Sequence, residues 1–138
     1  MSEREWSKWL SFQLKNFEVP PSSGVYQLRW AIDSHAQPIH RVDGVDEEGL
    51  IYIGKSNDLK SRIRGFWRYI TSEKGQNSAG FTYVFYDYER KFKPDQLEAR
   101  WMLLPEDEID EIETKLLDDY LNKYLDSPPL NISIKRPY

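Results

Sequence analysis

The feature that most constrains the fold is a pair of short tyrosine-bearing sequences, Gly24-Val25-Tyr26 and Tyr52-Ile53-Gly54. The first opens a run over residues 25–32 whose alternation and aromatic content predict a strand, and the second closes a similar run over 50–53. Gly54 is then expected to end the second strand. Because a capped amphipathic segment follows at once, the chain must fold as a sheet with a helix directly after its second strand.

The remaining segments predict a mixed fold. Ser56 or Asn57 can cap a helix that ends near residue 71 or 72. Apolar side chains at helical spacing predict an N-terminal helix over about 3–17, and the β-branched and aromatic run 81–88 predicts a third strand. Two more helices are expected, over about 95–104 and about 107–125, with Pro105 between them.

Composition indicates one domain and sets limits on its chemistry. A chain of 138 residues with 39% hydrophobic side chains is long enough to bury its own core. The lack of cysteine excludes disulfides, thiolate zinc sites and cysteine nucleophiles, and it permits a reducing compartment, so we expect a cytoplasmic protein. No apolar run approaches the roughly 20 residues that cross a bilayer, and no secretory signal is visible, so no membrane association is expected.

Charge is distributed unevenly along the chain. The net charge of -4 argues against a nucleic-acid partner, because phosphate contacts need clustered Lys and Arg. However, residues 52–74 hold six basic and two acidic side chains, a local +4, whereas residues 87–126 hold six basic and thirteen acidic ones, a local -7. This division is compatible with a DNA-facing side and a solvated back, and equally with an ordinary mixed surface.

The two triplets, with Lys55-Ser56-Asn57-Asp58-Leu59-Lys60-Ser61-Arg62 after the second, resemble the signature of the GIY-YIG nuclease superfamily. Glu113-Thr114-Lys115-Leu116-Leu117 resembles the family's glutamate followed by two apolar residues, and Pro129-Leu130-Asn131 resembles its terminal proline and asparagine. The resemblance implies a small antiparallel sheet with the triplets on adjacent strands, an arginine, here Arg62, on the next helix, and a glutamate, here Glu113, on a later one. Four elements in the same order are more specific than either triplet.

The sequence departs from this family in two places. Val25 stands where the family usually has isoleucine, a change of one methylene group. Between Tyr26 and Tyr52 lie 25 residues, more than the family's compact hairpin, so residues of about 33–49 are interpreted as an insertion. An inert surface loop is the default for this insertion, with a DNA-contacting flap or a partner site as alternatives.

Helical geometry selects Glu113 independently of the resemblance. At 100° per residue it falls at about 40° from Ile109, among the apolar side chains Leu116, Leu117 and Tyr120, whereas Glu111 falls at about 200° on a solvated face. A carboxylate on an apolar face is costly unless it is paired or binds a cation. Glu113 is therefore a candidate ligand for one divalent ion, Mg²⁺ or Mn²⁺, with a structural bridge to Arg62 or Lys55 as the alternative.

The other candidate site residues take roles that the resemblance implies. Tyr26 is expected to activate water, Tyr52 to position water or phosphate, and Arg62 to bind a phosphate oxygen with its planar fork. Either tyrosine alone could equally be a packing residue. Three supporting residues are Gly54, Lys55, which would act electrostatically, and Asn131, which would fix local structure through side-chain hydrogen bonds. Three basic residues are candidate DNA-backbone contacts or merely solubilising charge: Lys60, Arg64 and Arg68.

Other chemistries have less support. His35 and His40 lie in the insertion and do not make a zinc site by themselves, and Gly54-Lys55-Ser56 lacks the upstream glycine of a phosphate-binding loop.

The sequence thus predicts an α/β (α+β) domain over residues 1–138, with a small three-stranded antiparallel sheet flanked by helices. The expected function is that of a divalent-metal-dependent DNA endonuclease, acting on DNA that could be branched or damaged. Because a separate targeting domain is not visible, a protein partner could supply specificity, and the oligomeric state stays open. The alternative is a noncatalytic nucleic-acid-binding or protein-interaction module that retains the fold.

Overall fold

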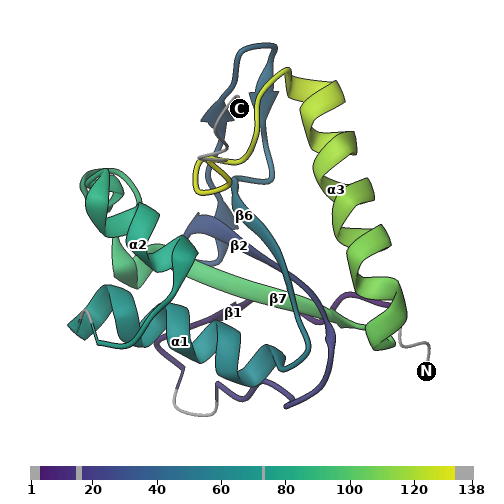
Figure 1. Ribbon diagram of the computed structural model, residues 1–138. Coiled ribbons are helices and arrows are strands. Elements are labelled where there is room, and N and C mark those ends of the chain that lie inside the picture. The colour runs from purple at the N-terminus through teal and green to yellow at the C-terminus, as the bar shows by residue number, and fades with distance from the viewer. Residues whose placement is uncertain (1–3, 15–16, 73, 133–138) are drawn as a thin grey trace, which may run out of the picture.

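An antiparallel sheet lies at the centre of the computed structural model, which describes residues 4–14, 17–72 and 74–132 (Figure 1). Its long strands are β2 (Gly24–Ile32), β6 (Leu50–Ser56) and β7 (Leu97–Leu103). β2 is the middle strand and pairs with β6 on one side and β7 on the other. The short strands β1 (Leu10–Ser11) and β3 (His35–Ala36) pair with β7 and with the end of β2, which makes five strands in the described residues.

Helices cover both faces of this sheet. α1 (Leu59–Ser72) and α2 (Ser78–Phe85) lie on one side and α3 (Ile109–Tyr124) on the other (Figure 1). Three single-turn 3-10 helices connect the later elements: η1 (Tyr88–Arg90), η2 (Pro94–Gln96) and η3 (Glu106–Glu108). The mixed α+β class with an antiparallel sheet flanked by helices is therefore confirmed, but the sheet has five strands in place of the predicted three, because β1 and β3 add short pairings at its edges. No helix in the described part of the chain is long and apolar enough to span a membrane.

The alternation of side chains along the strands creates two cores. Tyr26 and Leu28 of β2 point to one face, where they join the largest apolar cluster with Phe66 of α1 and Tyr83 of α2. Val25 points to the opposite face and packs in a smaller cluster that includes residues of α3. The middle strand thus reads as a nearly continuous buried run because both of its faces are covered.

Several predicted elements are confirmed. β2, α1 and α3 match their predicted positions within one or two residues, apart from the single 3-10 turn that precedes α3. The strand that carries the second triplet, β6, continues to Ser56, so the expectation that Gly54 ends it is wrong. Asp58 caps α1 by accepting the backbone N–H of Ser61, while Ser56 accepts the N–H of Asp58 in the turn before it.

The predicted N-terminal helix over about 3–17 is wrong for the residues that the structure describes; residues 3, 15 and 16 lie outside them. Leu10 and Ser11 form β1, which completes the hydrogen bonding of the outer edge of β7. Trp6 and Trp9 hold the guanidinium of Arg100 between them, at 4.4 and 4.6 Å from the ring centroids. Pairing to the sheet and stacking on arginine replace the helical packing that the apolar spacing indicated.

The third strand is also in a different place from the predicted one. Residues 81–88 were expected to be a strand, but they form the end of α2 and the beginning of η1, and the range 95–104, expected to be a helix, contains strand β7. The second range contains two charged side chains, Glu98 and Arg100. In the sheet their charges are satisfied by Arg29, whose Nε donates to Glu98 at 2.9 Å, and by Gln27, which accepts from Arg100 at 2.8 Å.

The segment 33–49 is structured and is attached to α3. Besides β3 it contains the hairpin of β4 (Ile39–His40) and β5 (Val45–Asp46). Asp46 is 1% exposed, and its carboxylate accepts a hydrogen bond from the Tyr120 hydroxyl at 2.7 Å. It also accepts hydrogen bonds from the backbone N–H groups of Glu48 and Leu50. This buried carboxylate joins the insertion to the second half of α3.

Candidate active-site groove

The register of β2 and β6 brings the two tyrosines together. Tyr26 lies opposite Gly54, and Tyr52, two residues before Gly54, points to the same face of the sheet. The ring centroids of Tyr26 and Tyr52 are 5.8 Å apart. A Cβ on residue 54 would lie 2.6 Å from the Tyr52 ring and 2.8 Å from the Tyr26 ring, so glycine is what lets both rings occupy this face.

The two tyrosines differ in exposure. Tyr26 is 1% exposed, whereas Tyr52 is half-buried and lines the groove described below. Burial, and after it the neighbouring Tyr52, raises the pKa of Tyr26 well above its ordinary value; the charge of Arg62 lowers it. Burial likewise raises the pKa of Tyr52, followed by the negative charge of Glu113. Both phenols are therefore protonated at neutral pH, and only Tyr52 meets the solvent of the groove.

Glu113 lies on the inner side of α3, as the helical geometry predicts. Its side chain is 20% exposed, while Glu111 is exposed on the outside. Lys55 approaches it from β6, with 3.7 Å between Nζ and Oε1, and also bonds to Asp110, one helical turn earlier. Burial raises the pKa of Glu113, and the charge of Lys55 opposes this effect.

The positive charge of Arg62 acts on both tyrosines and on the glutamate. Arg62 lies exposed on the first turns of α1, and its positive charge lowers the pKa of Tyr26, of Tyr52 and of Glu113. Because α1 begins directly after β6, the same short chain segment places Tyr52, Lys55 and Arg62 around the end of one strand. The second triplet and its following helix are therefore one structural unit.

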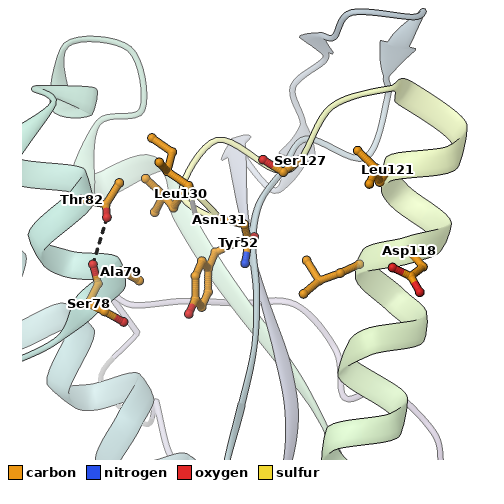
Figure 2. A pocket seen from close by; sticks show the side chains of 11 residues that line it. Tyr52, Ser78, Ala79, Thr82, Asp118, Leu121, Ser127, Leu130 and Asn131 are labelled. Atoms are coloured by element: carbon orange, nitrogen blue, oxygen red, sulfur yellow. Dashed lines mark hydrogen bonds between the residues drawn. The ribbon is translucent and has the colours of Figure 1, made fainter. Parts of the chain in front are cut away.

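These side chains surround a cleft of about 590 Å³. Its lining comes from β6, the start of α1, η3 and α3, and includes Tyr52, Lys55, Arg62, Asp110 and Glu113. Tyr52 also borders a second hollow of about 500 Å³ between α2 and α3. Figure 2 shows Tyr52 there, with Ser78 and Thr82 of α2 on one side and Asp118 and Leu121 of α3 on the other. We call the two together the groove.

Asn131 is placed at the outer edge of β6. Its side-chain oxygen accepts the backbone N–H of Ile53 at 2.9 Å, and its side-chain nitrogen donates to the backbone oxygen of the same residue at 2.9 Å. The neighbouring N–H of Leu130 donates to Ile51. The Asn131 amide and the Leu130 N–H together hold the backbone on both sides of Tyr52 and so fix its position.

The structure does not bring Lys60, Arg64 and Arg68 to the cleft. Arg64 follows Arg62 by two residues and is turned by about 200° around the helix. Arg64 and Arg68 instead border a separate hollow of about 340 Å³ next to Phe12 and Trp67. The basic residues that line the cleft among the described residues are therefore Arg62 and Lys55.

A divalent ion fits the carboxylates of the cleft if the substrate supplies further ligands. Mg²⁺ is commonly held by one or two carboxylates, waters and substrate phosphates. Glu113 is a partly desolvated carboxylate, Asp110 lies one turn away, and Lys55 now balances their charge. In residues 4–14, 17–72 and 74–132 there is no group of three or more His, Cys, Asp or Glu that could form a complete cage.

The sequence interpretation did not single out Asp110 or Ser78. Asp110 precedes Glu113 by three residues, so its position on the same side of the helix could have been read from the spacing. Ser78 borders the same hollow as Tyr52, and its hydroxyl lowers the pKa of that phenol. No local signal indicates this contact, because it depends on the turn between α1 and α2.

Comparison of the chain with models of protein families, with curated proteins and with solved structures found no match.

Proposed function

We propose that this chain is a divalent-metal-dependent endonuclease of the GIY-YIG type that hydrolyses DNA phosphodiester bonds in the groove. One observation carries the proposal: Tyr52, Arg62 and Glu113, from three separate elements, border one cleft with Lys55 between them. Phenol, guanidinium, ammonium and carboxylate are together the groups that orient a phosphate and hold a cation. A cytoplasmic location belongs to the same proposal, because a cysteine-free chain needs no oxidising compartment.

The side chains of the cleft have distinct roles in this reaction. Arg62 binds a non-bridging phosphate oxygen, and Lys55 supplies a second positive charge on the same side. Glu113 holds the divalent ion, which when bound stabilises the charge that develops on the phosphate and lowers the pKa of a coordinated water. Lys55, which is paired with Glu113 in the structure, would turn toward the phosphate when Glu113 holds the ion.

The roles of the tyrosines follow from their exposure. Sequence reasoning assigned water activation to Tyr26, but a phenol that is 1% exposed does not reach a water in the cleft. We therefore assign the water-facing hydroxyl to Tyr52 and make Tyr26 a positioning residue whose buried ring packs beside that of Tyr52. With both pKa values raised, Tyr52 orients the water and does not accept its proton as a preformed tyrosinate.

The test is cleavage of supercoiled plasmid and of branched DNA by purified protein in Mg²⁺ or Mn²⁺. Glu113→Gln and Arg62→Ala should each lower the rate by about 10²-fold or more, the range for loss of one charge-stabilising group. Tyr52→Phe should lower the rate more than Tyr26→Phe does. The matched controls Glu111→Gln and Arg90→Ala, exposed residues outside the groove, should cut within about twofold of wild type.

Three results would contradict parts of the proposal. If wild type leaves every substrate intact, the catalytic assignment fails, and equal DNA binding by wild type and Glu113→Gln would support the noncatalytic module. Cutting that survives Glu113→Gln would mean that the metal ligand is another residue. A larger loss of cleavage rate in Tyr26→Phe than in Tyr52→Phe would mean that Tyr26, and not Tyr52, contacts the water.

A further inference from the structure

An aromatic surface on α2 is not used by the proposed reaction. Phe81 is 47% exposed and Phe85 is 65% exposed, one helical turn apart, with their rings stacked at 5.3 Å and 16°. Tyr86 is also exposed and meets Phe85 edge to face. We call Phe81, Phe85 and Tyr86 the aromatic surface. These three side chains are exposed although the other face of the same helix, with Ala79 and Tyr83, fills the core.

This surface is continuous with the groove. Phe81 borders a hollow of about 520 Å³ whose lining includes Ser78, Thr82 and Ile132. The same three residues border the hollow between α2 and α3 that Tyr52 reaches. Because the two hollows share these lining residues, a chain that lies across Tyr52 can reach Phe81 by passing over them.

Charge favours this direction for a phosphate backbone. The α3 wall of the groove carries Asp118, whereas α2 has no charged residue, and among the described residues no carboxylate lines the hollow beside Phe81. Arg68, which the cleft does not use, lies beside Gly75 at the border of that hollow. A Cβ on Gly75, one of its lining residues, would be 3.3 Å from the Arg68 guanidinium.

We propose that the aromatic surface stacks unpaired bases of the DNA strand whose phosphate lies in the cleft, with Arg68 on its backbone. The inference rests on the proposed function and specifies its substrate as DNA with a single-stranded part beside the cut. Aromatic side chains bind single strands because every base offers a flat face, and stacking is sequence-tolerant. In a duplex the bases are already stacked on each other, so they offer no free face to the aromatic surface.

The experiment measures DNA binding without cleavage. A labelled single-stranded oligonucleotide and a blunt duplex of the same sequence are titrated with protein in EDTA, and fluorescence anisotropy gives the dissociation constants. Wild type should prefer the single strand by about tenfold. The double variant Phe81→Leu/Phe85→Leu, which keeps apolar bulk but removes the flat rings, should lose about tenfold or more on the single strand and stay within about twofold on the duplex. Phe85→Trp should bind as well as wild type or better.

Other results overturn the inference. Unchanged single-strand affinity of the double variant, or an equal loss on both DNAs, would exclude base stacking. A wild-type dimer in sedimentation that the double variant dissociates, with DNA affinity unchanged, would make the surface a contact between copies. Binding is measured without metal, so the two proposals can fail separately. A protein that binds single strands through the aromatic surface but does not cut DNA would overturn only the nuclease proposal. A protein that cuts DNA but shows no loss of single-strand binding in the double variant would overturn only the base-stacking proposal.

Discussion

Gly54 determines how close the two tyrosine rings can come to the strand. Replacing it with alanine should force both rings away, since the new Cβ would lie 2.6 Å from Tyr52 and 2.8 Å from Tyr26. We expect Gly54→Ala to lower the free energy of unfolding by about 1–3 kcal/mol, the usual cost of overpacking, measured by urea denaturation. Gly65→Ala is the control. Gly65 lies in α1, and the atom nearest to an added Cβ would be 3.8 Å away. This variant should therefore leave the free energy of unfolding unchanged or raise it by about 1 kcal/mol.

The desolvation of Glu113 predicts a dependence of stability on pH. Burial raises the pKa of this carboxyl, so the folded protein binds its proton more readily than the unfolded chain does. The free energy of unfolding should therefore rise as pH falls through the raised folded pKa toward the unfolded value of about 4.3. The variant Glu113→Gln has no titrating carboxyl at this position, so its free energy of unfolding should lack this part of the pH dependence. Parallel urea-unfolding profiles for the two proteins between about pH 4.5 and pH 8 would contradict the desolvation.

Sequence reasoning found the sides on which these residues lie but not their exposure. The side of Glu113 follows from helical spacing, and the resemblance puts the tyrosines on adjacent strands. That Tyr26 is covered while Tyr52 meets the groove could not be predicted, because both point to the same face. The difference arises because β2 has a strand on each side and β6 has a strand on one side only.

At the scale of elements, the errors occur where tertiary contacts outweigh local preference. β7 contains Leu, Glu, Ala, Arg and Met, all good helix formers, yet it pairs with β2 along seven residues and its charges find partners across the sheet. α2 contains a β-branched and aromatic run, yet Ala79 and Tyr83 at helical spacing fill the core. Gly80 matters here too, because a Cβ would lie 2.9 Å from the Tyr69 ring.

Asn77 is the residue that begins α2 in place of a strand. Its side-chain oxygen accepts the backbone N–H of Gly80 at 2.7 Å, and its side-chain nitrogen donates to the backbone oxygen of Arg62. We expect Asn77→Ala to cost about 1 kcal/mol in thermal or urea unfolding, the typical value of a helix cap. Gln76→Ala, an exposed amide next to it, should change stability by less than about 0.5 kcal/mol. Equal effects of the two variants would show that the cap does not hold α2.

At the scale of the whole molecule, the insertion is part of the structure that holds α3. Tyr120→Phe removes the hydroxyl that donates to the buried Asp46 carboxylate and should lower the free energy of unfolding by about 2 kcal/mol, as for other hydrogen bonds to charged groups. Tyr124→Phe is the control, since its hydroxyl makes no hydrogen bond in the described part of the chain, and it should cost less than about 0.5 kcal/mol. An equal cost for both would mean that ring packing alone attaches the insertion.

The amide of Asn131 has a consequence for how copies of this protein behave toward each other. In the described residues β6 is paired on one side only, and an open strand rich in apolar residues is a template for pairing with another chain. Asn131 occupies both backbone groups of Ile53, and Leu130 occupies the oxygen of Ile51. The side chain that steadies Tyr52 for the groove therefore also protects the exposed border of the sheet from edge-to-edge aggregation.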